Sequence, residues 1–272
     1  MSTLSGSPLL RQWNLIHNFG QRDLKTKFKG SALGWLWSLA VPLATLGIYS
    51  VVFSIIFRAQ PPEMGNGSQG VFVIWLFCGL TAWTFFSSTI NAGMSGLLGT
   101  GALLQKVYFP AYAPVLGAAL ASGVQWGIEV GILAVVLLIL LNVGWSWLLI
   151  PLWAIIFIIF TSSLAVTVSI LNIYFRDLAH LVAIALQLLF YMTPIIYPMS
   201  IVPTDWRGSI NLQAILEINP LTQFVELFRS LIYGLDVGSW TQWVSILIWS
   251  AASLMLARWV TNAKGRDLGE HV

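Results

Sequence analysis

The stretch from Gln21 to Pro42, QRDLKTKFKGSALGWLWSLAVP, decides the fold class of this 272-residue chain. Its first half carries four cations: Arg22, Lys25, Lys27 and Lys29. No further charged residue follows until Arg58. A helix needs about 20 mostly apolar residues to cross a bilayer, and the uncharged run 30–57 is long enough. The stretch therefore predicts a positively charged junction directly before a membrane span.

The composition of the whole chain agrees with a membrane protein. Charged residues make up 8% of the chain and apolar residues 57%, whereas a soluble domain carries about a quarter charged residues. A single water-soluble domain is therefore excluded. The one cysteine, Cys78, lies in an apolar run and has no partner for an intrachain disulfide. The first residues lack the charged-then-apolar order of a cleavable signal peptide, so we expect the mature chain to begin here.

Uncharged windows predict six membrane spans. One span each lies in Gly30–Phe57, Met64–Gln105, Leu178–Thr204 and Val237–Ala257, and Val107–Phe175 holds two that separate at Asn142–Gly144. We therefore expect an all-α integral membrane protein with one transmembrane domain. It would comprise an interfacial segment at 1–29, a six-span bundle at 30–260 and a tail at 261–272.

The distribution of Lys and Arg predicts the orientation. If the N-terminus is cytoplasmic, ten of these residues fall on the cytoplasmic side, and the three outside are Arg58, Arg207 and Arg229. Short cytoplasmic loops are enriched in Lys and Arg. We therefore expect a multi-pass protein of the plasma (inner) membrane with both termini cytoplasmic.

Two further segments predict amphipathic helices that do not cross. In Leu9–Phe19 apolar residues recur at helical spacing, which suits a helix in the cytoplasmic interface. In Asn219–Gly234 the asparagine can cap, Pro220 suits the first position and Gly234 can stop the helix. Its apolar stripe comprises Leu221, Phe224, Val225, Phe228, Leu231 and Ile232, with Gln223, Glu226 and Arg229 away from it. About fifteen residues rise only ~22 Å, so we expect this helix on or in the outer face.

The sequence offers little support for chemistry within the chain. Lys25–Thr26 is the only Lys followed by Ser or Thr, and Leu24 precedes it where a phosphate-binding loop needs glycine. If ATP drives this protein, another polypeptide holds the ATP and Mg, and we expect no cofactor here. The three histidines lack ligand spacing, so we expect no metal site. A nucleic-acid partner is not expected either.

Two intramembrane motifs have competing interpretations. Gly93–Gly96 resembles the GxSG nucleophile motif of rhomboid proteases, but its only candidate base, His180, lies at the predicted start of span five. Small residues usually serve close helix packing, which we favour. Glu129 is the one intramembrane acid and thus a candidate for function. We favour a structural carboxyl that is hydrogen-bonded to a neighbouring helix or to Gln125, because no cation lies within the spans.

The tryptophans predict two roles. Six near predicted boundaries fit interfacial anchors: Trp13, Trp145, Trp147, Trp206, Trp240 and Trp259. Five others are candidates for an aromatic translocation path: Trp35, Trp37, Trp75, Trp83 and Trp126. Sugar rings can stack on aromatic faces as nucleic-acid bases do. Interfacial anchoring is the competing interpretation for each of the five.

Five motifs in register with the six spans resemble those of polysaccharide-exporting ABC transporter permeases. They are KGSALGWLWSLAVP, LLQKVYFP, NIYFRDL, YMTPIIYP and INPLTQFVELFRSLIYG. Members move lipid-linked O-antigen, capsule, teichoic acid or galactan chains. The resemblance runs from about Arg11 to the C-terminus. It implies the membrane-spanning subunit of an ATP-driven exporter that moves a lipid-linked polysaccharide from the cytoplasmic side across the plasma membrane.

The resemblance also implies partners and contact residues. It implies a homodimer that binds two copies of a separate ATPase. The ATPase-coupling candidates are Leu104, Gln105 and Lys106 in one cytoplasmic turn and Arg176 and Asp177 in the next. Asp177 can alternatively cap span five. An outer gate would comprise 212–216 and 220–233 with Phe224, Glu226, Phe228 and Arg229; a plain interfacial anchor is the competing interpretation.

The basic cluster that opens the argument has two possible roles. Arg22, Lys25, Lys27 and Lys29 lie where a lipid diphosphate would approach, and each cation near the membrane surface attracts anions by ~1 kcal/mol. A basic cluster before a first span also fixes orientation, which alone would explain it. Two alternative functions remain: an ABC exporter of small lipophilic molecules, and a secondary carrier or intramembrane enzyme.

Overall fold

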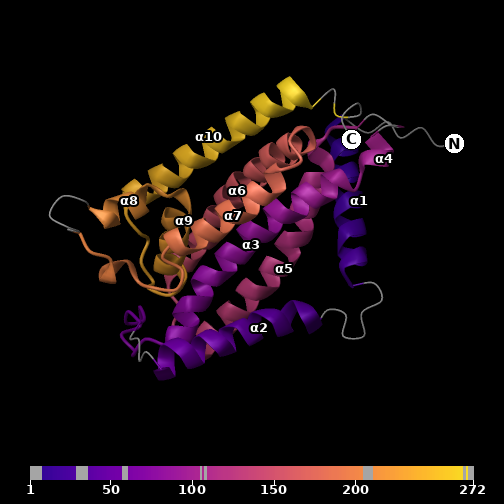
Figure 1. Cartoon of the computed structure of the whole chain (residues 1–272). Coiled ribbons are helices and arrows are strands. Elements are labelled where there is room, and N and C mark those ends of the chain that lie inside the picture. The colour runs from indigo at the N-terminus through magenta and orange to yellow at the C-terminus, as the bar shows by residue number, and fades with distance from the viewer. Residues whose placement is uncertain are drawn as a thin grey trace.

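The computed structural model describes residues 8–28, 36–56, 61–104, 106, 109–204, 211–265 and 268. Within these residues the chain is helical and contains no strand (Figure 1). The elements are α1 (Pro8–Phe28), α2 (Trp37–Ser50) continued by the π-helix η2 (Val51–Ile56), α3 (Phe72–Leu98), α4 (Gly101–Leu104), α5 (Tyr112–Ile139), the 3-10 helix η3 (Trp145–Leu149), α6 (Ile150–Tyr174), α7 (Leu178–Met192), the 3-10 helix η4 (Met199–Ile201), α8 (Leu212–Ile218), α9 (Pro220–Ile232) and α10 (Trp240–Lys264).

Four helices among the described residues are long and apolar enough to cross a membrane. They are α3, α5, the continuous run Trp145–Tyr174 and α10. They correspond to the second, third, fourth and sixth predicted spans. The predicted break at Asn142–Gly144 is confirmed, because α5 ends at Ile139 and the chain turns at Leu141, whose φ is 56°. The architecture is that of a multi-pass membrane protein.

The fifth predicted span is shorter in the structure, and the first is described only from Leu36 to Ile56. The described part of the first covers α2 and η2, and α7 has 15 residues. Helix α7 ends because Thr193, which precedes Pro194, is extended with ψ 133°, and the proline ring disfavours helical backbone before it. The predicted fifth span to Thr204 is thus interrupted after Met192. The count of six spans stays a prediction.

The core forms where α3 packs between α5 and α6, with α10 on the far side of α6. Small residues bring these helices together. A Cβ at Gly93 would lie 2.9 Å from Val115 and 3.0 Å from the hydroxyl of Ser169. The hydroxyl of Ser95 donates a hydrogen bond to the carbonyl of Asn91 at 2.9 Å, within the same helix. The GxSG match is therefore a helix-packing motif, as favoured from the sequence.

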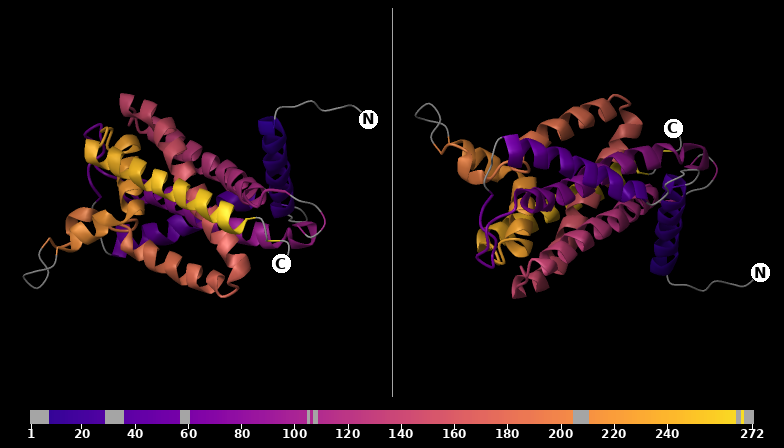
Figure 2. Two further views of the ribbon diagram at one scale, coloured as in Figure 1. Left: turned by 90° about the horizontal axis from the view of Figure 1, so that it is seen from above. Right: turned by 90° about the horizontal axis from the view of Figure 1, so that it is seen from below.

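Helix α1 crosses one end of the bundle, against α5 (Figures 1 and 2). Two glycines permit the crossing: a Cβ at Gly117 would lie 2.5 Å from the Cβ of Phe19, and one at Gly20 would lie 3.1 Å from the carbonyl of Gly117. The residues of α1 that lie beside α5 belong to its middle and its last turns, from Leu15 to Thr26. Leu10 and Trp13, part of the predicted apolar stripe, are therefore exposed.

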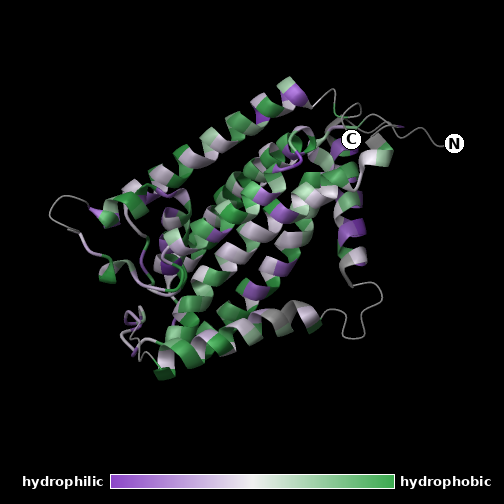
Figure 3. Cartoon of the chain, in the orientation of Figure 1, coloured by the Kyte–Doolittle hydropathy of each residue, from purple (hydrophilic) through white to green (hydrophobic). Residues whose placement is uncertain are grey.

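Exposed tryptophans mark the two ends of α10. Trp240 is 80% exposed and Trp259 is 67% exposed. Their separation along the helix is about 29 Å, which matches the ~30 Å hydrocarbon thickness of a bilayer. Interfacial tryptophans form belts at this spacing. Figure 3 agrees, since hydrophobic residues cover most of the long helices and hydrophilic ones are prominent in α1 and in the loop that precedes α3.

Candidate functional site

Helix α9 begins as the sequence predicts, but it ends differently. Asn219 caps it by accepting a hydrogen bond from the backbone N–H of Leu221 at 3.0 Å, and Pro220 is the first helical residue. Gly234 follows the helix without a positive φ; the left-handed residue is Leu235, with φ 54°. The predicted glycine stop is thus wrong in mechanism, because the reversal occurs one residue later.

The apolar stripe of α9 is buried in the bundle. Phe224 and Phe228 have no exposed surface. Trp153 of α6 stacks on Phe228 with ring centroids 4.5 Å apart, and its indole N–H donates to the carbonyl of Phe224 at 3.2 Å. Phe157 lies 4.9 Å from Phe224. Helix α9 is therefore inserted among α3, α6 and α10 and does not lie on the surface.

Arg229 is buried along the edge of this apolar stripe. Its Nε donates to the carbonyl of Trp75, and its two terminal nitrogens donate to the carbonyls of Pro194 and Ile195. It also pairs with Glu226 at 3.0 Å, and its guanidinium lies 3.7 Å from the centroid of the Trp75 ring. One cation thus fastens α9 to α3 and to the turn after α7.

The guanidinium fits because α3 carries a glycine at the contact. A Cβ at Gly79 would overlap Nη2 of Arg229. The sequence periodicity places Arg229 off the apolar stripe. It does not indicate that α3 and the turn after α7 cover this residue.

The loop before α3 and the turn after α5 are tied to the end of α9. The hydroxyl of Tyr233 donates to the carbonyl of Pro62 at 2.9 Å and accepts from the N–H of Val71 at 3.2 Å. Burial raises the pKa of Tyr233 to about 12, so the phenol keeps the proton that it donates. The amide of Asn142 donates to the carbonyl of Tyr233 at 2.9 Å and accepts from the N–H of Asn66 at 3.1 Å.

A groove of about 390 Å³ lies between α3 and α7. Its lining combines aromatic rings with amide and hydroxyl groups: Trp83, Ser87 and Asn91 from α3, and Gln187, Phe190 and Tyr191 from α7. The rings of Trp83 and Phe190 are 5.4 Å apart. Aromatic faces stack on rings, and amides donate and accept hydrogen bonds. This combination suits a sugar.

Four of the five candidate path tryptophans are described in the structure, and they do not lie together. Trp83 lines the α3–α7 groove, and Trp75 lies under Arg229. Trp126 is buried in the core, with its ring 5.1 Å from that of Phe85. Trp37 is exposed at the start of α2. Trp35 lies outside the described residues.

The two predicted coupling turns lie at the same end of the bundle as α1 (Figure 1). Leu104 ends α4, and Lys106 is exposed. Gln105 lies outside the described residues. In the second turn Arg176 and Asp177 are both exposed.

Asp177 holds the N-cap position of α7, but its side chain caps nothing. Its backbone is helical, with φ −74° and ψ −12°, and the side chain accepts no capping hydrogen bond. Capping normally requires an extended backbone at this position. The prediction that Asp177 caps span five is therefore wrong, which leaves its carboxylate available at the surface.

Three cations of the basic cluster, Arg22, Lys25 and Lys27, lie in the last turns of α1. Arg22 pairs with Asp23 at 3.1 Å, and both line a groove of about 460 Å³ with small residues of α3 and α5. Lys25 is exposed. Lys27 belongs to α1 as well, and Lys29 lies outside the described residues. Cations in the last turn of a helix are favoured by its dipole, which explains why α1 continues through them.

Glu129 is buried and hydrogen-bonded, as predicted. Its carboxylate accepts from the hydroxyl of Thr84 on α3 at 2.9 Å and from the amide of Gln125 at 3.2 Å. The carboxyl thus links α5 to α3. This geometry favours the structural interpretation over ion transport.

Residues 15–233 match the ABC-2 type transporter family of membrane proteins. Because this covers most of the chain, the chain belongs to that family, and the resemblance inferred from its motifs is confirmed. The chain is 27% identical over 256 residues to the O-antigen export system permease protein RfbA of Myxococcus xanthus, covering 90% of this chain and 92% of that protein. An RfbA of Klebsiella pneumoniae is 29% identical over 222 residues, 80% of each chain. The polysialic acid transport protein KpsM of Escherichia coli is 23% identical over 220 residues, 76% of this chain and 77% of that protein.

Family membership defines the class of protein. Permeases of this family work with an ATPase subunit, so the chain is a membrane subunit of a transporter and not a catalyst.

Proposed function

We propose that this chain is the membrane-spanning subunit of an ATP-driven exporter that moves a lipid-linked polysaccharide from the cytoplasmic side across the plasma membrane. The observation that carries the proposal is similarity along most of the chain to permeases named for O-antigen and polysialic acid transport. The aromatic and amide lining of the α3–α7 groove supports it, because small lipophilic cargo would not need such hydrogen-bonding groups.

Six spans with both termini cytoplasmic complete this proposal. The α2–η2 segment and α7 supply the first and fifth spans within a single domain of 30–260, flanked by the interfacial segment 1–29 and the tail 261–272. The tryptophan pair of α10 supports the membrane frame, and the excess of cations at the α1 end supports a cytoplasmic location for that end.

The working unit would be a homodimer with two ATPase copies that hold ATP and Mg. Support comes from α7, which buries only Leu186 and exposes a row of apolar residues: Leu181, Ile184, Leu188 and Met192. The α2–η2 segment is similarly exposed, at Leu43 and Ile48 of α2 and at Ile55 of η2. A second copy against these helices would place two α3–α7 grooves beside a shared path. Trp83 is then the candidate path tryptophan that contacts sugar.

The ATPase would contact the turn with Leu104, Gln105 and Lys106 and the turn with Arg176 and Asp177. Their common location at the α1 end supports this assignment. Charge reversal of Lys106 and of Arg176 tests it, because each change should weaken co-purification of the ATPase and abolish export. Normal association and export in both variants would contradict it.

At the same end, Arg22, Lys25, Lys27 and Lys29 would attract the diphosphate of the lipid carrier. Their competing role is to fix orientation. Neutralising Lys25, Lys27 and Lys29 separates the two, since substrate handling predicts normal orientation with lost export. Inverted orientation would assign the cluster to topology.

At the outer end, α8 and α9 would form the gate. Phe224 and Phe228 fasten α9 to α6, and Arg229 with its partner Glu226 fastens it to α3. Opening would therefore move α9 together with these neighbours.

The double variant Trp83→Ala with Gln187→Ala tests the groove. Loss of one stacked ring costs about 1–3 kcal/mol, so export should fall at least fivefold while ATPase association stays normal. Trp259→Ala, at an exposed anchor, is the matched control. Unchanged export in the double variant, or ATPase activity stimulated by hydrophobic drugs and not by lipid-linked glycan, would contradict the proposal.

A further inference from the structure

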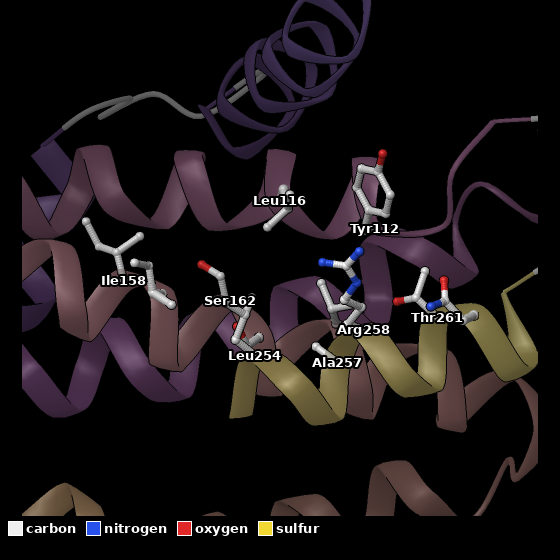
Figure 4. A pocket seen from close by; sticks show the side chains of 12 residues that line it. Tyr112, Leu116, Ile158, Ser162, Leu254, Ala257, Arg258 and Thr261 are labelled. Atoms are coloured by element: carbon white, nitrogen blue, oxygen red, sulfur yellow. The ribbon is translucent and has the colours of Figure 1, made fainter. Parts of the chain in front are cut away.

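A second groove lies between α5, α6 and α10, on the other side of the bundle from α7 (Figure 2). Its volume is about 470 Å³. Helix α5 contributes Tyr112 and Leu116, α6 contributes Ile158 and Ser162, and α10 contributes Leu254, Arg258 and Thr261 (Figure 4). None of these residues belongs to the predicted coupling turns, to the basic end of α1 or to α9. The groove is therefore separate from the sites described above.

The groove is charged at one end only. Figure 4 shows the Arg258 side chain extending from α10 across the groove toward Tyr112 and Leu116, with Thr261 beside it and Ile158 at the far end. Apart from Ser162 and Ser163, the residues that line the groove between Arg258 and Ile158 are aliphatic. Within the described part of the chain, Arg258 forms neither an ion pair nor a hydrogen bond. An occupant thus meets one cation and then an apolar channel.

The membrane frame gives the depth of the two ends. Arg258 precedes Trp259, the exposed anchor at one end of α10, so its guanidinium lies at headgroup level. Leu254 is one turn deeper, about 6 Å toward the bilayer centre. Ile158 and Val166 of α6 line about 12 Å of channel. The polar end therefore faces headgroups, and the apolar part lies at acyl-chain depth.

We propose that this groove binds one anionic phospholipid, with its phosphate on Arg258 and one acyl chain along α6 and α10. A single cation complements the single negative charge of a phosphodiester. The groove does not extend to the basic cluster of α1, which suits a diphosphate better. The bound chain would fill the gap between α10 and α5 and hold α10 in place. The inference requires only a membrane protein, so it stands independently of the proposed cargo.

Native mass spectrometry of the purified full-length chain tests the proposal, with phosphatidylglycerol and phosphatidylcholine supplied in equal amounts. The wild type should retain about one phosphatidylglycerol per chain in preference to phosphatidylcholine. One cation near the surface contributes ~1 kcal/mol, so Arg258→Gln should lower this preference about fivefold, whereas Arg258→Lys should keep most of it. Leu254→Trp should block retention of both lipids. The matched controls Lys264→Gln and Met255→Trp, on the same helix outside the groove, should behave as the wild type.

Photo-cross-linking of the wild type with an acyl-diazirine phosphatidylglycerol gives a second measurement that needs no variant. Adducts should fall in 158–166 and 254–262. Equal retention of the two lipids, no effect of Arg258→Gln, or adducts only elsewhere would overturn the proposal. Displacement of phosphatidylglycerol by a polyprenyl diphosphate would assign the groove to the carrier lipid instead. Disulfide formation between two chains through Leu254→Cys, in a Cys78→Ala background, would assign it to a second copy.

Discussion

Replacing Arg229 with methionine removes the guanidinium and keeps most of its aliphatic stem. The change leaves the carbonyls of Trp75, Pro194 and Ile195 without their donor. It also removes the cation from the Trp75 ring and the partner from Glu226, whose side chain is 28% exposed. The perturbation therefore acts on α3, α9 and the turn after α7 together.

The expected loss of stability follows from these contacts. A buried polar group without a partner costs about 1–3 kcal/mol, and removing one member of a buried ion pair costs about 3–5 kcal/mol. Glu226 can reach solvent, and the three carbonyls can accept hydrogen bonds from backbone N–H groups instead. We therefore expect Arg229→Met to lower the free energy of unfolding by about 3–4 kcal/mol.

Gly79→Ala supplies an internal check on this reasoning. A methyl group at Gly79 would overlap the guanidinium, so the change should cost about 1–3 kcal/mol in the wild type by overpacking. In the Arg229→Met background the space is free, and alanine improves helix propensity by up to ~1 kcal/mol. The double-mutant cycle should therefore show a coupling of about 2–3 kcal/mol.

The assay is reversible unfolding in mixed detergent–SDS micelles, followed by far-ultraviolet circular dichroism. Arg176→Met, at an exposed arginine in a turn, is the matched control and should change stability by less than about 0.5 kcal/mol. Two results would refute the reasoning: Arg229→Met within about 1 kcal/mol of the wild type, or an equal effect of Gly79→Ala in both backgrounds.

Three further predictions use the same titration or a simple companion assay. Asn142→Ala should cost about 1–3 kcal/mol, because it leaves the N–H of Asn66 without its acceptor and removes one of the two donors to the carbonyl of Tyr233, which keeps the N–H of Gly65. A loss below about 0.5 kcal/mol would show that these loops are not tied to α9. Gly117→Ala should displace α1 and speed tryptic cleavage near Arg22. The control Gly131→Ala, where an added Cβ would have no atom within 4 Å, should leave the cleavage rate unchanged. Equal cleavage rates in the two variants would argue against the glycine crossing. Glu129→Gln should keep export and stability, while Glu129→Leu should cost about 1–3 kcal/mol, because it removes the buried acceptor that links Thr84 of α3 to α5. Lost export in a stable Glu129→Gln protein would assign the carboxyl to transport.

Local signals in the sequence predict part of this fold well. The cap at Asn219, Pro220 and the apolar stripe give the start and buried face of α9, because cap chemistry and helical periodicity are both local. The break at Asn142–Gly144 is likewise readable from turn residues. The hydrogen bond between Gln125 and Glu129 follows from their separation of one helical turn.

Other features depend on which helices meet, and no local pattern encodes that. Arg229 lies off the apolar stripe and resembles a surface residue, yet α3 and the turn after α7 cover it. Trp153 and Phe157 are two positions in an apolar run. They form the contact surface for α9 only because α9 packs against them in the folded chain. The burial of Trp126 in the same core has the same cause.

Uncharged length is also a poor measure of helix length. The window Leu178–Thr204 has no charged residue, but Pro194 and Pro198 divide it, so α7 ends at Met192. Gly20 is the converse case, a residue that disfavours a helix but lies inside one. It lies in the middle of α1, where glycine weakens a helix, yet it is retained in the structure as the point of close approach to α5.

The central claim is that this chain moves a lipid-linked glycan with energy from a partner ATPase. The most direct measurement is reconstitution of the purified permease with that ATPase in vesicles, followed by ATP hydrolysis and by the appearance of the glycan on the opposite side. Lipid-linked glycan should stimulate hydrolysis and cross the membrane only with ATP, while hydrophobic drugs should do neither. Stimulation by drugs alone, or glycan movement without the ATPase, would contradict the account.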